Sequence, residues 1–454
     1  MKTYQDLVAV GNVETSRMDF IQKAVGEHKQ SEKYQVASAA EKYYAKKNVT
    51  IEKFQKLLRK LDGTTVPDFF SANYKLKTLF FRRFVIQQAQ YVLSNGVDFK
   101  SKKTKDQLGK RFDNMIQKMA KKAMVDHVSF GFWNKDHLEV FCFADTPKDP
   151  GFVPLYDDDT GELMAGIRYW YPNESTERYT LYEVDGFTEY KKTSDKPCEV
   201  LKKKRSYIQN TTKAPADREA VVTGSNYGRL PIIPMYANDL HESELVGHRE
   251  SIDCYDFIKS GFANAIDESS DFYWILKNSG GMDDVDLACF VERMKTVRAA
   301  TVDADDGAGA EAHTLEIPTE AREKMLTILK NDLYEDFQIV NVATLSAGNK
   351  TATEINAAYQ PMDDKCGDFE YCIRDFIDQL MELVGVQDTY SFRWNKIANK
   401  TEETQMVMTA YAVLGDELAL KKLPFLTPEE SEARIKELTA EDANRTKTEP
   451  PEEE

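Results

Sequence analysis

The strongest constraint on this chain is a helical pattern that continues from Leu240 to Tyr273. At 1.5 Å per residue, an uninterrupted helix of that length would span about 50 Å. A helix this long cannot bury an apolar stripe within a small domain, so we expect it to pack on a partner helix in the same chain or a neighbouring subunit. The apolar positions recur at spacings of three and four residues: Ile252, Tyr255, Ile258, Phe262, Ile266, Ser269 and Tyr273.

The same helix carries a second, polar and largely acidic stripe. Its members are Asp253, Asp256, Ser260, Asn264, Asp267 and Asp271.

The rest of the chain changes texture in a fixed order. Frequent Lys, Glu, Ala and Gln predict helices over residues 1–60, and apolar stripes predict helices at 72–93 and 105–125. Alternating aromatic and polar residues predict antiparallel strands from 128 to 236. A small irregular module follows at 274–318, and a helix starts at Pro318–Thr319. A small polar loop at 341–354 then leads into a helix that reaches Val384, which Pro361 should kink or delimit, and two further helices precede a charged tail.

Composition excludes several classes of protein. The net charge of −16 over 454 residues argues against a basic DNA-coating protein, although residues 1–130 carry +12 and the remainder −28. The basic face of the 105–125 helix could contact nucleic acid, but a solvated face is the commoner use of such a pattern. Six scattered cysteines favour a reducing compartment, and neither a signal peptide nor an apolar membrane span is expected.

Sequence motifs for catalysis are incomplete throughout. The stretch Gly348–Thr351 resembles the end of a phosphate-binding loop, but Asn349 separates its glycine from Lys350. The acidic cluster at 157–162 lacks the spacing of a calcium loop and predicts a hairpin turn. His241 and His248 could share a helix face, but a solvated helix start is the ordinary explanation. We therefore expect no catalytic residue, no metal and no cofactor.

The order of these elements resembles that of tailed-phage portal proteins, in the branch similar to the portal of Bacillus phage SPP1. Four stretches carry the resemblance: LPIIPMYANDLHESELVGHRESIDCYDFIKSGFANAIDESSDFYWIL at 230–276, the pair Leu76–Val97 and Lys110–Gly131, PLYDDDTGELMAGIRYWYP at 154–172, and LKKLPFLTPEESEARIKEL at 420–438. It covers nearly the whole chain.

The resemblance implies an α+β portal fold. Its parts would be an N-terminal wing at 1–239 (helical at 1–127, β-rich at 128–239), a stem helix at 240–273, a small α/β clip at 274–318, a second stem helix at 319–337, a tunnel loop at 338–352, a long kinked wing helix at 353–398, a helical crown at 399–441 and a disordered acidic tail at 442–454.

The resemblance also implies a ring of about twelve copies at one capsid vertex of the virion, assembled in the host cytoplasm. Double-stranded DNA would pass through it non-specifically, pumped in by terminase and later ejected. The implied partners are the terminase large subunit, head-completion or adaptor proteins, the major capsid protein and scaffold, with no membrane.

Two groups of residues would face the DNA. Dense Lys or Arg contacts would make a channel bind phosphates tightly, so an acidic wall suits sliding. We expect the polar stripe of the first stem helix, Asp253 to Asp271, to line the bore. The tunnel loop would add weak contacts from Leu345, Ser346, Asn349, Lys350 and Thr351.

Two other functions remain open at this stage. One is a metal-dependent DNA-processing enzyme with scattered acids such as Asp157 and Asp159; metal-dependent nuclease activity would favour it. The other is a helical oligomeric adaptor protein, which would form small oligomers instead of a large closed ring.

Overall fold

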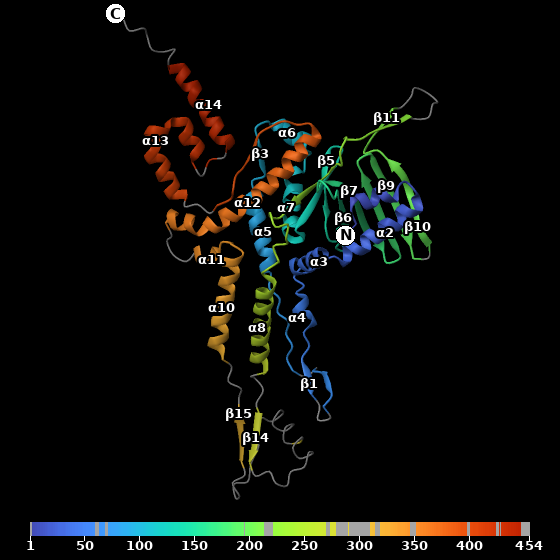
Figure 1. Cartoon of the computed structure of the whole chain (residues 1–454). Coiled ribbons are helices and arrows are strands. Elements are labelled where there is room, and N and C mark those ends of the chain that lie inside the picture. Colours follow the sequence, from blue (N-terminus) through green and yellow to red (C-terminus); the bar gives the residue numbers. More distant parts are fainter. Residues whose placement is uncertain are drawn as a thin grey trace, which may run out of the picture.

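The structure is a computed structural model (Figure 1). It describes residues 2–59, 63–68, 71–194, 196–212, 221–268, 273–277, 289, 309–313, 318–345, 351–396, 400–423, 426 and 428–445. A mixed body of helices and sheet lies at one end, and two antiparallel helices project from it. The fold is α+β, as expected.

The N-terminal part of the body is helical, as the sequence predicts. It contains α1 (Tyr4–Val10), α2 (Glu14–Gln30), α3 (Glu32–Tyr44) and α4 (Val49–Lys53). A short hairpin follows, formed by β1 (Leu57–Arg59) and β2 (Thr65–Pro67).

The next two predicted helices begin or break at other residues than expected. The helix predicted from residue 72 begins only at Phe80, as α5 (Phe80–Leu93), because residues 72–78 are extended. The pattern at 105–125 is divided into α6 (Lys102–Gln107) and α7 (Phe112–Asp126). Gly109 separates them with a φ of +94°, and a Cβ atom there would lie 2.8 Å from the Asp136 carbonyl oxygen.

An eight-stranded sheet forms the centre of the body and confirms the antiparallel strands expected over 128–236. Its order is β10-β9-β8-β7-β6-β5-β4-β13, with a single parallel bridge between β5 and β6 at Cys142 and Gly151. The strands are β4 (Val128–Asn134), β5 (His137–Cys142), β6 (Gly151–Tyr156), β7 (Leu163–Asn173), β8 (Thr176–Glu183), β9 (Gly186–Thr193), β10 (Lys196–Arg205) and β13 (Ile232–Tyr236). A separate ribbon, β11 (Ile208–Thr212) with β12 (Val221–Ser225), extends beyond it.

Helices cover the sheet and bury its aromatic residues. Residues of α1 and α2 pack on β6 to β9, and α7 packs on β4 and β5. The largest cluster joins α5, α7 and α12 (Ala352–Val384). Gly131 of β4 permits the close approach of α12, since a Cβ atom there would lie 2.6 Å from the Phe376 ring.

The two projecting helices are α8 (Arg249–Glu268) and α10 (Thr319–Asp336), which we call the stem pair. The first is shorter than predicted, because residues 240–248 form turns that cap α7: the Ser243 hydroxyl donates to the Val125 carbonyl at 2.6 Å, and the Glu244 amide donates to the Met124 carbonyl at 2.9 Å. Beyond the stem pair, β14 (Tyr273–Lys277) pairs antiparallel with β15 (Gly309–His313).

The C-terminal part begins with the short helix α11 (Val342–Leu345). Helix α12 continues through Pro361 and ends at Val384, where Gly385 has a left-handed conformation, so the predicted long helix stops well before residue 398. Then β16 (Tyr390–Phe392) pairs with β3 (Val97–Phe99), and α13 (Lys400–Lys422), interrupted at Gly415, packs on α14 (Pro428–Arg445).

Candidate channel-lining site

Three members of the polar stripe on α8 bind an extended segment of the same chain. Asn264 Oδ1 accepts from the Tyr74 amide at 2.6 Å, and Ser260 Oγ accepts from the Leu76 amide at 3.0 Å. Asp256 accepts from the Thr78 amide and from Asn48 Nδ2, both at 2.9 Å. Every fourth residue of the helix thus meets every second residue of the segment, and all three side chains are buried.

The prediction that these three side chains line a channel is therefore wrong. A buried side chain whose acceptors are filled by backbone amides of its own chain cannot face a bore. Burial also raises the pKa of Asp256, while the bonds from Asn48 and Thr78 lower it.

The other members of the stripe differ among themselves. Asp253 is partly buried and accepts a 2.5 Å hydrogen bond from the Tyr43 hydroxyl. Asp267 is exposed, and Asp271 lies outside the described residues. For these residues the channel-lining role stays a prediction.

Only the two ends of the predicted tunnel loop are described. Leu345 ends α11 and packs against the main core, while Thr351 caps α12 through a reciprocal capping box with Glu354. Ser346, Asn349 and Lys350 lie outside the described residues, so their contact with DNA stays a prediction.

A buried ion pair joins the stem pair to α12. Lys365 Nζ lies 2.5 Å from Glu244 Oε2, with side chains only 15 % and 9 % exposed, and it also donates to the Phe337 carbonyl at 3.2 Å. Phe337 directly follows α10 and its ring stacks on that of His248, which precedes α8, with ring centroids 3.8 Å apart. One ammonium therefore ties the body ends of both stem helices to α12.

Sequence reasoning missed this joint. Glu244 stands within the stretch that carried the family resemblance, but it and Lys365 are 121 residues apart, and no spacing rule links such positions.

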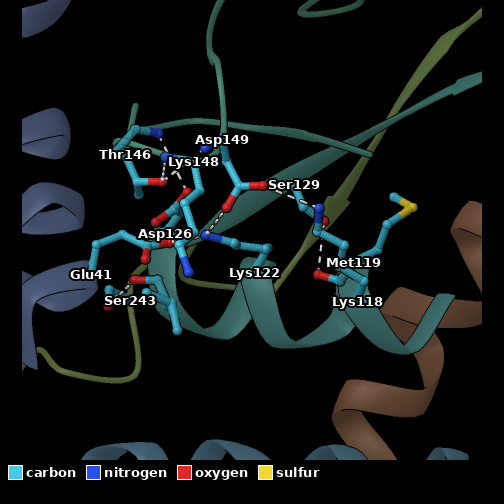
Figure 2. Close-up of polar contacts among 12 residues, drawn as sticks. Glu41, Lys118, Met119, Lys122, Asp126, Ser129, Thr146, Lys148, Asp149 and Ser243 are labelled. Atoms are coloured by element: carbon cyan, nitrogen blue, oxygen red, sulfur yellow. Dashed lines mark hydrogen bonds and ion pairs between the residues drawn. The ribbon is translucent and has the colours of Figure 1, made fainter. Parts of the chain in front are cut away.

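Two basic residues of α7, Lys118 and Lys122, form ion pairs within the body (Figure 2). Lys122 lies 2.5 Å from a Glu41 carboxylate oxygen of α3 and 3.4 Å from one of Asp149, and Lys118 lies 3.1 Å from Asp149. Burial, then the nearby Glu41, raises the pKa of the fully buried Asp126 well above its usual value. This cluster holds α3, α7 and the loop after β5 together, so Lys118 and Lys122 serve contacts within the chain.

The acidic cluster proposed for an enzyme forms a turn. Asp157 Oδ1 accepts from the amides of Asp159 and Thr160, at 3.1 and 2.9 Å, and Asp157 Oδ2 accepts from Gln5. Within the described residues, no group of three or more His, Cys, Asp and Glu side chains is arranged to hold a metal ion.

No helix in the described part of the chain is both long and apolar enough to cross a bilayer.

Comparisons with known proteins agree with the sequence resemblance. The family model described as "Phage portal protein, SPP1 Gp6-like" matches residues 23–447. The portal protein of Clostridium phage phiCD119 is 25 % identical over 292 residues, covering 62 % of this chain and 63 % of that protein. The portal protein of Bacillus phage SPP1 is 24 % identical over 424 residues, covering 87 % and 82 % respectively.

One solved structure, titled as the neck of an empty GTA particle computed with C6 symmetry, has 10 % identity and a TM-score of 0.41 and covers 79 % of this chain and 89 % of its own. A likeness at that level adds nothing to the assignment. The family match extends over most of the body, the stem pair and α12. The chain therefore belongs to the SPP1 Gp6-like family of phage portal proteins.

Proposed function

We propose that copies of this chain form a closed ring, of about twelve subunits, through which double-stranded DNA enters and leaves a phage capsid. The single observation that carries the proposal is the family match over residues 23–447, which includes both helices of the stem pair. The family is a structural one, and we assign no catalytic residue and no cofactor.

We assign the parts of the ring from the order of elements. The body up to β13 is the wing, α8 and α10 are the stem, and the segment between them with β14 and β15 is the clip. Residues 338–352 are the tunnel loop, α12 is the wing helix, and α13 with α14 form the crown. In this assignment the clip meets the terminase large subunit and later the head-completion or adaptor protein, and the wing meets the capsid protein and scaffold.

A direct test is negative-stain microscopy with native mass measurement of the concentrated protein, alone and with scaffold and capsid protein. We expect a ring with a central hole and a mass near twelve times 51.9 kDa. Small oligomers under all these conditions would favour the adaptor protein instead.

The tunnel loop has a separate test in phage. Lys350→Ala and Asn349→Ala should lower the amount of packaged DNA without altering the ring, because both changes remove polar contacts expected at the bore. Thr404→Ala, in α13, serves as the control. Normal packaging in both loop variants would refute the loop's role.

A further inference from the structure

The order of elements across the stem suggests which surfaces meet between copies. We call α4, β1, β2 and the extended residues 71–78 the arm. The arm contacts α8 from one side and α10 contacts α8 from another, so that the series runs α10, α8, arm (Figure 1). Building on the proposed ring, we infer that the arm of one copy docks on α10 of the next copy.

Hydrogen bonds and a ring contact hold the arm on α8 within one copy. The three hydrogen bonds from Tyr74, Leu76 and Thr78 fix its extended stretch, and Asn48, which caps α4, binds Asp256 as well. Beside these bonds, the Phe54 and Phe257 rings meet edge to face at 5.0 Å. Both polar and aromatic contacts within one copy therefore join the arm to α8.

Both surfaces leave large apolar side chains uncovered. On the arm, Leu57 is 60 % exposed, and Phe54 and Tyr74 surround a cavity of about 240 Å³ that Gly261 and Arg322 help to line. On α10, Leu329 and Leu333 are buried, whereas Met325 and Ile328 are exposed. Apolar groups of this size gain from burial, and within the described residues these side chains stay exposed.

Charge complementarity selects a second copy as the cover. Residues 49–78, which span the arm, hold six Lys or Arg against three Asp or Glu, whereas α10 holds five Asp or Glu against three Lys or Arg. One of those three, Arg322, is directed at the Gly261 carbonyl of α8. Glu320, Asp332 and Glu335 are exposed on α10. A basic apolar surface and an acidic apolar surface on one chain form a head-to-tail contact, the type that closes a ring.

Photo-crosslinking within the assembled ring tests the contact. A benzophenone amino acid replaces Leu57, and ¹⁵N-labelled and unlabelled copies are mixed before assembly so that links between copies can be distinguished by mass. We expect crosslinks from residue 57 to peptides of 319–336 in another copy. The same probe at Val8, an exposed residue of α1, is the control and should not reach α10.

A substitution gives an independent measure. Ile328→Glu should reduce the ringed fraction at least tenfold at a fixed concentration, while Val8→Glu leaves it unchanged. If rings form but residue 57 links only within its own copy or to another element, the docking inference is overturned and the proposed function stands. If the unaltered chain forms no ring even with scaffold and capsid protein, the proposed function fails and this inference with it.

Discussion

The body and the stem pair bury their side chains in different ways. In the body, large rings such as Phe130, Phe152 and Phe376 are fully enclosed by the chain's own sheet and helices. In α8, beyond Ile252, the most enclosed side chains are polar and bind the backbone of the arm, while Phe257 and Ile266 are exposed. The body thus encloses its largest rings within one copy, whereas α8 leaves large apolar side chains exposed.

The largest expected effect comes from a cavity in the body, which tests how far the body depends on its own packing. Phe376→Ala should lower the free energy of unfolding by about 3–5 kcal/mol, because the ring fills the space between α12 and Gly131. Urea unfolding followed by near-ultraviolet circular dichroism measures the change. Tyr371→Ala, on the same helix but 72 % exposed, should cost less than about 0.5 kcal/mol. Equal losses would mean that α12 does not depend on this packing.

The second largest loss of stability is expected at the ion pair of Lys365 and Glu244, which joins the body to the stem pair. Lys365→Met should cost about 3 kcal/mol, because it leaves the Glu244 carboxylate buried without its partner. Adding Glu244→Met should recover most of the loss, and the exposed pair Lys421 and Glu417 provides the control, where Lys421→Met should be nearly neutral. A double variant as unstable as the single one would assign the loss to packing alone.

Acid should weaken the body before the stem pair. Burial lowers the pKa of His28 to about 4 and that of His127 to about 3. Each ring binds its proton more readily in the unfolded chain, so stability is full above pH 6.5 and falls as the pH approaches the folded value.

The expected loss is about 2 kcal/mol per histidine between pH 7 and pH 5. Urea unfolding at several pH values measures it. His28→Gln should remove roughly half of the slope, and His137→Gln, at an exposed hairpin, should leave it intact. A flat profile in the unaltered protein would contradict the assignment to these two rings.

The smallest expected effect comes from weakening the contact between the arm and α8 without changing the body. Asn264→Ala should cost about 1 kcal/mol by removing the acceptor of the Tyr74 amide. Hydrogen exchange measured by mass spectrometry should show roughly fivefold faster exchange in the peptide containing residues 73–78. Asn331→Ala, at an exposed position of α10, should not change that peptide.

Hydrophobic periodicity predicted the presence of helices that face the core more accurately than the residues at which those helices begin and end. The second stem helix was expected at 319–337 and occupies Thr319–Asp336, because Pro318 is a local signal for its start. The start of the first was missed by nine residues, since Ser243 and Glu244 instead cap α7 through contacts with residues more than 100 positions away.

The candidate site was harder to predict for a related reason. A regular polar stripe on a helix can meet water, or it can meet the backbone of an extended segment. The sequence does not distinguish the two, because the amides of residues 74, 76 and 78 are present whatever their side chains are. The stripe was therefore assigned to a channel, although most of its described members hold the arm.

The pairing of α8 with the extended segment can continue over only a few hydrogen bonds, because the residue spacings of the two differ slightly. Four helical residues advance about 6.0 Å, and two extended residues advance about 6.6 Å. Each backbone donor therefore shifts by about 0.6 Å relative to its acceptor on the helix at every step. Three such hydrogen bonds keep an acceptable geometry, whereas a much longer series would lose it. A one-residue insertion between Tyr74 and Thr78 would misalign the hydrogen bonds beyond it, whereas added residues in the β1–β2 turn would leave all three aligned.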